Sequence, residues 1–321
     1  MYPRLSDLFR DYLGFDFPIP IYSYGFMIAL GVLAAAWLLQ TELNRLYKAD
    51  RIGGIKIPDP SARKSKKKAR KKLVEVSPSY LVGTITVLTI VAGFAGGKLF
   101  HILENLDTFF VDPMAIIFAK GGFTFYGGLI VGGISVAWYV KKKGISVAVL
   151  ADAVAPGMML GYGIGRIGCQ LTGDGTWGIA ANLAAKPGWV PDFLWAETYP
   201  ENILGIDLSS APVYPTPIYE FIMASLLFAV LWNMRDHIHT AGWLFWTYLV
   251  FNGIERFSIE TIRINNRFDV FGITMTQAQF ISVVLIVLGA VGMWMTWSKK
   301  GESKVPKPID VISEPAAESN T

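Results

Sequence analysis

The chain has 321 residues, of which 52% are hydrophobic and 17% are charged, with a mean hydropathy of +0.41. A soluble globular domain carries about 25% charged residues, so this composition indicates a polytopic membrane protein. The single cysteine, Cys169, excludes a disulfide within the chain. No P-loop, dinucleotide fingerprint or zinc-ligand spacing is present in the sequence, and its histidines, His101, His237 and His239, do not cluster.

Seven apolar segments are long enough to predict membrane-spanning helices. The predicted ranges are 21–42, 80–102, 122–140, 147–168, 217–234, 241–259 and 274–297. Small residues recur in several of them, as at Gly93, Gly96 and Gly97, and such residues let helices approach closely in lipid. The fold class that we expect is an all-α membrane protein, a bundle of seven transmembrane helices over residues 21–297.

Lysine and arginine are concentrated in connections that would share one side of this bundle. The first connection, 43–79, carries twelve of them, and others lie at 141–143, at 235 and beyond 298. Cation-rich loops face the cytoplasm, so the N-terminus is predicted outside and the C-terminus inside. We interpret the basic run 63–72 as a topology determinant attracted to anionic headgroups, and predict the lipid bilayer, not nucleic acid, as its partner.

Three further segments complete the predicted domain organisation. Residues 1–20 form an external N-terminal segment, and the polar tail 298–321 is predicted to be disordered in the cytoplasm. The segment 169–216 is long for a loop, so we expect a small external head domain there. Its aromatic residues are interpreted mostly as membrane-interface anchors: Trp177, Trp189, Phe193, Trp195 and Tyr199.

Arg166 lies in a glycine-rich run, 161–178, at the end of the fourth predicted helix. An arginine at membrane depth is costly, and intramembrane charges usually mark function. A planar, permanently charged guanidinium between glycines suits the phosphate of a lipid. The alternative is that Arg166 snorkels to the interface or pairs with Asp174, which needs no ligand.

Other polar residues are predicted at the same outward depth. Arg256, Glu260 and Arg263 are spaced four and three residues apart, so they share one helix face. Tyr24 begins the first span and Tyr126 begins the third. We expect these groups to converge with Arg166 if the bundle is compact. A buried ion-pair network that only fixes helix packing is the alternative interpretation.

Five elements of the chain, in this order, resemble the signatures of bacterial prolipoprotein diacylglyceryl transferases. They are Tyr24-Gly25, Gly121–Gly128, Gly165–Gly178, Tyr214–Glu220 and Arg256–Arg263. The chain departs from the family pattern at five positions. Tyr126 and Tyr214 stand where histidine is usual, and Cys169 stands where asparagine is usual. Asp174 replaces the usual glutamate, and Asn252 the usual tyrosine.

The resemblance implies transfer of a diacylglyceryl group from phosphatidylglycerol to the lipobox cysteine thiol of prolipoproteins, the first step of bacterial lipoprotein maturation. Glycerol 1-phosphate is released, and no metal or organic cofactor is required. The implied partners are phosphatidylglycerol and prolipoprotein signal peptides, and the location is the bacterial cytoplasmic (inner) membrane. The implied catalytic residues are Arg166, Arg256, Glu260 and Tyr126. The implied lipid- or phosphate-binding residues are Arg166, Tyr24, Gly127, Gly128, Gly165, Gly168, Asp174 and Arg263.

The substituted positions leave alternatives for the proton acceptor and for the function. The thiol proton could pass to Tyr126, Asp174, Glu260 or water, and Cys169 is interpreted as a small filler more readily than as a nucleophile. Three other functions fit the scaffold: another lipid-headgroup or acyl transferase, an inactive lipid-binding relative, or a transporter with an arginine-lined path. The absence of a clear internal repeat argues against a transporter.

Overall fold

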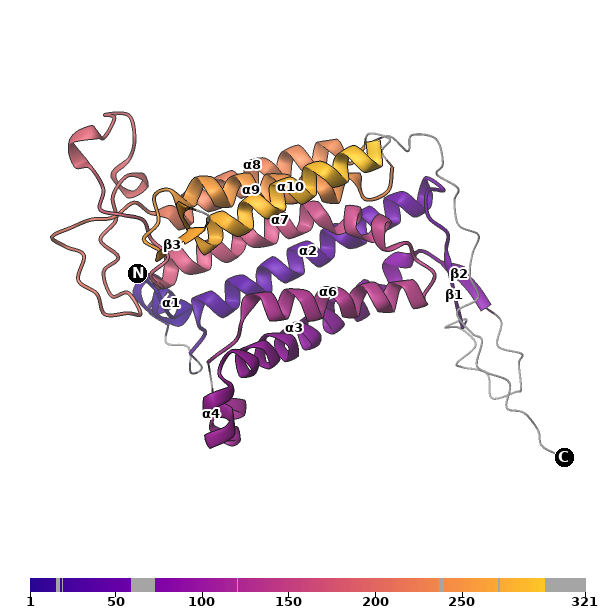
Figure 1. The fold of residues 1–321 in the computed structure, drawn as a ribbon, viewed down its shortest axis with the longest axis horizontal. Helices are drawn as coiled ribbons and strands as arrows, with labels where there is room; N and C mark the ends of the chain where they lie inside the picture. The colour runs from indigo at the N-terminus through magenta and orange to yellow at the C-terminus, as the bar shows by residue number, and fades with distance from the viewer. Residues whose placement is uncertain are drawn as a thin grey trace. The chain divides into compact units, whose positions relative to one another are not determined.

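The computed structural model describes residues 1–15, 18, 20–58, 73–119, 121–236, 240–270 and 272–297. This part of the chain is mostly helical (Figure 1). The basic run 63–72, the predicted disordered tail 298–321 and the loop histidines His237 and His239 lie outside the described residues.

Long helices dominate the described part of the chain. Those of 18 residues or more are α2 (Ser23–Lys48), α3 (Val82–Glu104), α6 (Phe125–Lys142), α7 (Val147–Thr172), α8 (Thr216–Met234), α9 (Trp243–Glu260) and α10 (Gln277–Trp297). Each overlaps one of the seven predicted ranges. Five of them, α2, α3, α7, α8 and α10, are long and apolar enough to cross a membrane. The other two are more polar, because α9 carries three charged residues and α6 ends in two lysines.

Short elements connect the long helices, and some of them are strands. The short helices are α1 (Leu5–Leu13), α4 (Leu106–Val111) and α5 (Pro113–Phe118), with 3₁₀ helices at Pro78–Leu81, Leu183–Ala185 and Asp192–Leu194. Strand β1 (Ile55–Pro58) pairs antiparallel with β2 (Leu73–Val76), and β3 (Arg267–Val270) with β4 (Ile273–Thr276). The prediction of an all-α fold is therefore wrong in this detail. Four-residue strands are too short to show a clear alternation of apolar residues.

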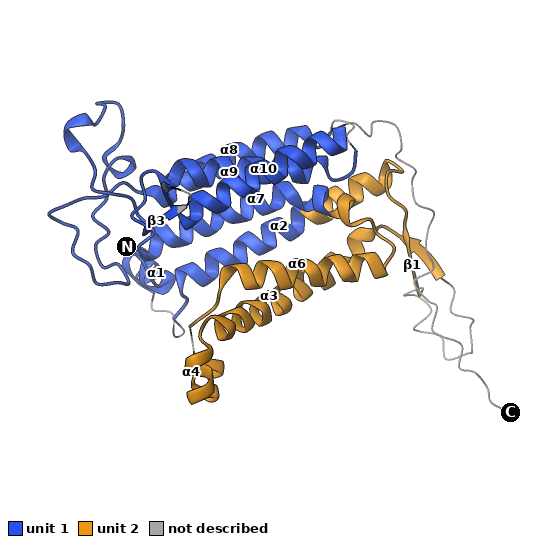
Figure 2. Ribbon diagram, viewed as in Figure 1, with its two compact units in different colours: residues 1–38, 151–303 blue, residues 39–150, 304–321 orange. Residues whose placement is uncertain are grey.

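The chain forms two compact units, coloured separately in Figure 2. Unit 1 contains residues 1–38 and the described residues from 151 onward, and unit 2 contains residues 39–150. In unit 1, α9 packs against α8 and α10. Buried side chains from α7, α8 and α9 form its core: Ala155, Met159, Ala224, Leu231, Leu244 and Tyr248.

Glycines allow close contact between helices in both units, as the sequence predicts. In unit 1 a Cβ on Gly31 of α2 would lie 2.9 Å from the carbonyl oxygen of Gly161 on α7. In unit 2 a Cβ on Gly96 of α3 would lie 2.5 Å from the carbonyl oxygen of Gly127 on α6. Any larger side chain at these positions would force the helices apart, since the neighbouring atoms are backbone.

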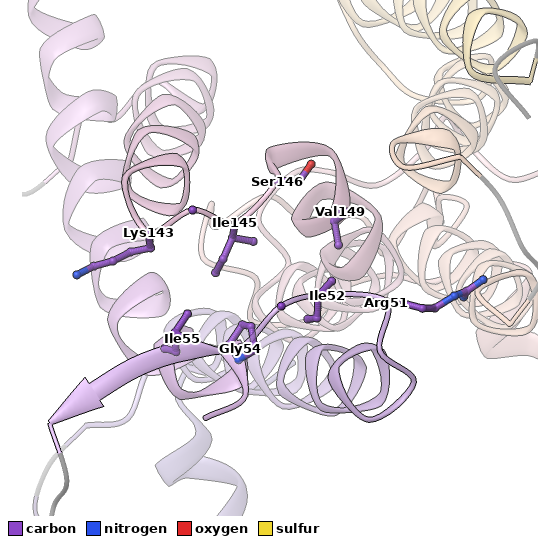
Figure 3. Close-up of a pocket in the computed structure, with 11 residues that line it drawn as sticks. Arg51, Ile52, Gly54, Ile55, Lys143, Ile145, Ser146 and Val149 are labelled. Carbon is purple, nitrogen blue, oxygen red and sulfur yellow. The ribbon is translucent and has the colours of Figure 1, made fainter. Parts of the chain in front are cut away.

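Unit 2 also contains a pocket between the turn that follows α2 and the connection from α6 to α7 (Figure 3). Ile52, Ile55 and Ile145 line its interior, whereas the charged ends of Arg51 and Lys143 point away from its centre (Figure 3). The lining is therefore apolar and presents no cation to a ligand.

The segment between α7 and α8, residues 173–215, has an apolar cluster of its own. Trp177, Tyr199 and Val213 are buried there, with the rings of Trp177 and Tyr199 5.0 Å apart. Burial raises the pKa of Tyr199, and its hydroxyl donates a hydrogen bond to Gln170 at 2.7 Å. Interpreting these two aromatic residues as interface anchors is therefore wrong, while Trp189 is 85% exposed as an anchor would be.

Candidate active site

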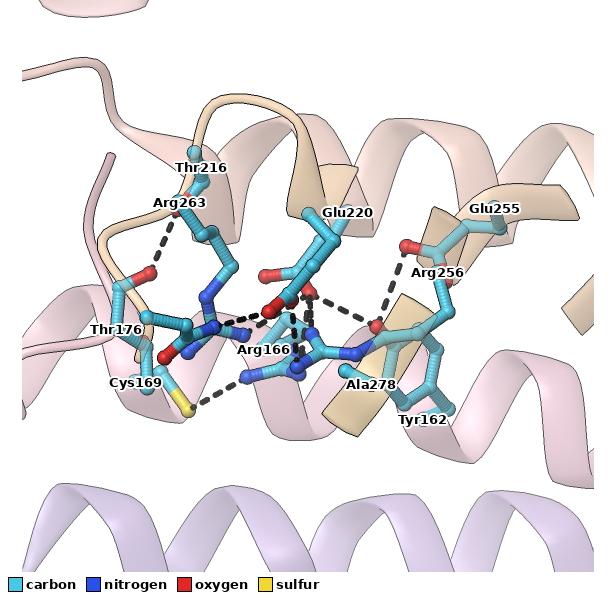
Figure 4. A network of polar contacts seen from close by, with 12 residues as sticks. Tyr162, Arg166, Cys169, Thr176, Thr216, Glu220, Glu255, Arg256, Arg263 and Ala278 are labelled. Carbon is cyan, nitrogen blue, oxygen red and sulfur yellow. Dashed lines mark hydrogen bonds and ion pairs between the residues drawn. The ribbon is translucent and has the colours of Figure 1, made fainter. Parts of the chain in front are cut away.

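The centre of the candidate site is Glu220, a fully buried carboxylate one turn into α8. Its Oε1 atom lies 3.0 Å from Nη2 of Arg166 on α7 and 3.2 Å from Nη1 of Arg256 on α9. Nη1 of Arg263, just beyond the end of α9, lies 3.7 Å from the same oxygen (Figure 4). We call Arg166, Arg256 and Arg263 the arginine cluster. Three guanidinium groups, one from α7 and two from the region of α9, thus meet at one carboxylate oxygen.

A second carboxylate orients one member of the cluster. Glu260 is one helical turn after Arg256, and its Oε2 lies 3.1 Å from Nη2 of that arginine. Its other oxygen accepts a hydrogen bond from the side-chain amide of Asn265. Glu260, which the sequence predicts on one helix face with Arg256 and Arg263, therefore pairs with Arg256, at the ordinary spacing of four residues.

Backbone contacts from the segment after α7 hold the end of α9. Gly178 forms an antiparallel bridge with Arg263, and the Ile179 N–H donates to the Ile262 carbonyl oxygen at 2.8 Å. A Cβ on Gly178 would lie 2.9 Å from that carbonyl oxygen, so glycine is needed there. The Thr216 hydroxyl, at the start of α8, donates to the Thr176 carbonyl oxygen at 2.6 Å. The segment after α7 is therefore bonded both to the start of α8 and to the residues just beyond α9, and these three helices, with Arg263 just beyond α9, carry Glu220 and the arginine cluster.

Tyr162 lies one turn before Arg166 on α7, and its ring packs 5.1 Å from the Arg166 guanidinium carbon. Its hydroxyl oxygen is 3.0 Å from Oε1 of Glu220 and 3.2 Å from Oε1 of Glu255, a buried residue of α9. On the other side of Arg166, Nη1 is 3.8 Å from the sulfur of Cys169. The guanidinium of Arg166 is thus held on both sides by its own helix.

The arginine cluster offers more hydrogen-bond donors than its carboxylates can accept. Each guanidinium has five N–H groups, and an ionised carboxylate has only acceptor oxygens. Oε2 of Glu220 is buried and accepts no hydrogen bond, and Nε of Arg166 is buried with no hydrogen-bond partner within the described part of the chain. Buried donors of this kind are costly unless a ligand or water satisfies them. The geometry therefore suits an anion, and the described residues contain no group of histidine, cysteine and acidic side chains that could hold a metal.

Most of the charged residues predicted for the site do meet. Arg166, Arg256, Glu260 and Arg263 are joined directly or through Glu220. The alternative pairing of Arg166 with Asp174 is not the arrangement adopted, because Arg166 pairs with Glu220. Asp174 instead accepts hydrogen bonds from the backbone N–H and the hydroxyl of Thr176, at 3.2 and 2.7 Å.

The tyrosines and glycines predicted for the site are divided between the two units. Gly168 lies against the start of α2, where its Cβ would be 3.3 Å from Cα of Tyr24, while Gly165 has open space beside it. In unit 2, Gly127 and Gly128 contact the backbone of α3. Tyr126, on α6 of the same unit, is 40% exposed. Its convergence with the arginine cluster stays a prediction.

Glu220, Tyr162 and Glu255 are not among the site residues predicted from the sequence. Glu220 is an isolated carboxylate within an apolar helix, and a charge at such a position is a functional hypothesis in its own right. Tyr162 precedes Arg166 by four residues and therefore shares its helix face. These two signals were present in the sequence, whereas the pairing across three helices needs the fold.

Comparisons with known proteins give the family. A family model described as prolipoprotein diacylglyceryl transferase matches residues 62–295. The chain belongs to this family. A phosphatidylglycerol–prolipoprotein diacylglyceryl transferase of Clostridium tetani is 30% identical over 274 residues, which cover 85% of this chain and 92% of that protein. A protein of the same name from Pseudomonas putida is 30% identical over 297 residues, covering 89% and 94%.

More distant members align over nearly the whole chain. The relative from Leptospira interrogans is 24% identical over 355 aligned positions, which cover 94% of this chain and 98% of the relative. Family membership and the long apolar helices together make this chain a multi-pass membrane transferase.

Proposed function

We propose that the chain transfers a diacylglyceryl group from phosphatidylglycerol to the lipobox cysteine thiol of a prolipoprotein and releases glycerol 1-phosphate. Relatives that align over most of its length carry the name of this activity. The observation that carries the proposal is the convergence of the arginine cluster on Glu220, with an unpaired buried donor on Arg166. The phosphodiester of phosphatidylglycerol supplies acceptor oxygens for those donors.

The cluster would act on the leaving group. The sulfur attacks the glyceryl carbon that bears the phosphate, a C–S bond forms, the C–O bond breaks, and its electron pair stays on the phosphate oxygen. The thiol proton passes to a base or to water. Arg166 and Arg256 hold the phosphate and stabilise the negative charge that develops on it, and losing one such donor slows comparable reactions about 10²- to 10³-fold.

The remaining predicted site residues are assigned supporting roles. Glu260 orients Arg256, Arg263 adds positive charge, and Asp174 shapes the turn after α7. We assign Tyr24 and Tyr126 to hydrogen bonds with the lipid headgroup. The glycines would let the headgroup approach the backbone: Gly127, Gly128, Gly165 and Gly168.

We further propose that all seven long helices cross the membrane, with the N-terminus outside and residues 169–216 as an external head. An 18-residue helix such as α6 or α9 is roughly 27 Å long at 1.5 Å per residue, close to the thickness of about 30 Å of the hydrocarbon core. The charges of α9 do not oppose insertion of this helix, because they face Glu220 and Tyr162 inside unit 1.

A reconstituted transfer assay tests the function. The purified full chain is mixed with phosphatidylglycerol labelled in both its acyl chains and its terminal glycerol, and with a lipobox peptide. We expect the acyl label on the peptide cysteine in a thioether, and the glycerol label in released glycerol phosphate. A peptide with serine in place of cysteine is the control. An unlabelled peptide, or transfer of a single acyl chain, would contradict the proposal.

A further inference from the structure

A buried carboxyl group beside the site has no role in the mechanism described above. Glu255 of α9 is 2% exposed and lies on the opposite side of Tyr162 from Glu220 (Figure 4). The Tyr162 hydroxyl oxygen is within hydrogen-bond distance of both carboxyl groups, 3.2 Å from Glu255 and 3.0 Å from Glu220. Glu255, Tyr162 and Glu220 therefore form a continuous chain of oxygen atoms that leads to the arginine cluster.

The number of hydrogen atoms available to Glu255, Tyr162 and Glu220 limits which of the two carboxyl groups can be ionised. A phenol has one hydrogen and can donate it to only one acceptor. If both carboxyl groups were ionised, one of the two contacts would place two oxygens together with no hydrogen between them. One carboxyl group must therefore be protonated for both contacts to be hydrogen bonds.

The surroundings decide which carboxyl group holds the proton. Oε1 of Glu220 faces three guanidinium groups, which stabilise its ionised form. Oε2 is buried without a hydrogen-bond partner on both Glu220 and Glu255 in the described part of the chain, but no guanidinium lies within ion-pair distance of Glu255 there. An ionised carboxylate in that position would be costly. The proton therefore belongs to Glu255.

Among the described residues, Glu255 forms no ion pair with a neighbouring cation. The charged and titratable groups that face it are Tyr162 and Arg166 from α7, Glu220 from α8, and Tyr248 and Arg256 from its own helix. Both arginines are already engaged by Glu220. Helix α10, which also packs against α9, has no titratable side chain.

We propose that Glu255 is a neutral carboxylic acid that donates its proton to the Tyr162 oxygen, while Tyr162 donates to Glu220, and that this sets the charge of the lipid-binding site. The three arginines, less Glu220 and Glu260, leave one positive charge. This matches the single negative charge of a phosphodiester, and ionised Glu255 would cancel it. Glu255 is thus a positioning residue, and the charge match rests on the proposed function.

Infrared spectroscopy of the purified protein without substrate tests the proton assignment. We expect a carbonyl band of a protonated carboxyl group that is lost in Glu255→Gln. The matched control is Glu260→Gln, on the same helix and equally buried but ion-paired, which should keep the band. In Tyr162→Phe the band should move to higher frequency, because the acceptor of its hydrogen bond is gone. A band missing from the wild-type protein, or unmoved by Glu255→Gln and Tyr162→Phe, would overturn the assignment.

Activity measurements test the consequence for the site. Glu255→Gln, which stays neutral and can still donate to Tyr162, should keep turnover within about threefold of wild type, while Glu255→Leu should lose about tenfold or more. The ratio of Glu255→Gln to wild-type turnover should rise with pH, since only the wild-type residue ionises. Equal losses in the two variants and a flat ratio would overturn the charge argument. A carboxyl band without any lipid transfer would contradict the proposed function alone.

Discussion

At the scale of single residues, the site is an excess of buried positive charge around one carboxylate. Buried ion pairs add little net stability, because desolvation offsets their attraction. Arg166, Arg256 and Arg263 are thus better explained by a ligand than by packing. Charged residues stand out in an apolar sequence, so these arginines and Glu260 could be predicted. The role of Glu220 could not be predicted. Its partners lie on α7, on α9 and just beyond α9, and the order of residues in the sequence does not show that these segments meet.

Arg166 should be sensitive even to a substitution that keeps its charge. In Arg166→Lys, a single ammonium replaces a planar fork that pairs with Glu220 and still has donors for a phosphate. We expect turnover in the reconstituted transfer assay to fall about a hundredfold. Arg267→Lys, an exposed arginine of β3, is the matched control and should behave like wild type. Near-normal turnover of Arg166→Lys would remove the phosphate role and favour an arginine that only supports packing.

At the scale of secondary-structure elements, the length of each apolar run of residues predicts the long helices. All seven predicted ranges contain a helix, because about 20 apolar residues form a helix in lipid whatever their detailed sequence. The antiparallel pairs β1–β2 and β3–β4 are not predicted by the sequence, since strand pairing depends on neighbouring residues more than on intrinsic preference. The bridge between Gly178 and Arg263, just beyond the end of α9, likewise depends on a segment about 80 residues earlier in the chain, which is within reach only after folding.

The start of α9 gives a prediction at this scale. Gly242 precedes the helix and has no side chain to cap it, and Asp152 of α7 accepts the Gly242 and Phe245 N–H groups at 2.6 and 2.8 Å instead. Asp152→Ala should therefore lower stability by about 1–2 kcal/mol, while Asp152→Asn, which keeps an acceptor, should lose less. Thermal unfolding in detergent measures both variants against wild type. Equal stability of the alanine and asparagine variants would show that Asp152 does not cap the helix.

At the scale of the whole molecule, the distribution of lysine and arginine predicts the orientation in the membrane, which the helices alone do not. The helices could be inserted in either direction, and only the clustering of lysine and arginine in alternate connections distinguishes the two orientations. The internal arrangement of residues 173–215 was less predictable. Its aromatic residues fit both an interface and a core, and their burial depends on contacts with residues as distant as Met1.

The orientation is tested by labelling two matched serines changed to cysteine. Ser210 lies in the segment between α7 and α8 and Ser146 in the connection between α6 and α7, and both are exposed. The parent chain gives the background, because its one cysteine, Cys169, is only 6% exposed. In intact spheroplasts, a membrane-impermeant thiol reagent should modify Ser210→Cys and spare Ser146→Cys, whereas inverted vesicles should give the opposite result. The reverse pattern would place the arginine cluster near the cytoplasmic face, where a secreted lipoprotein precursor does not present its cysteine.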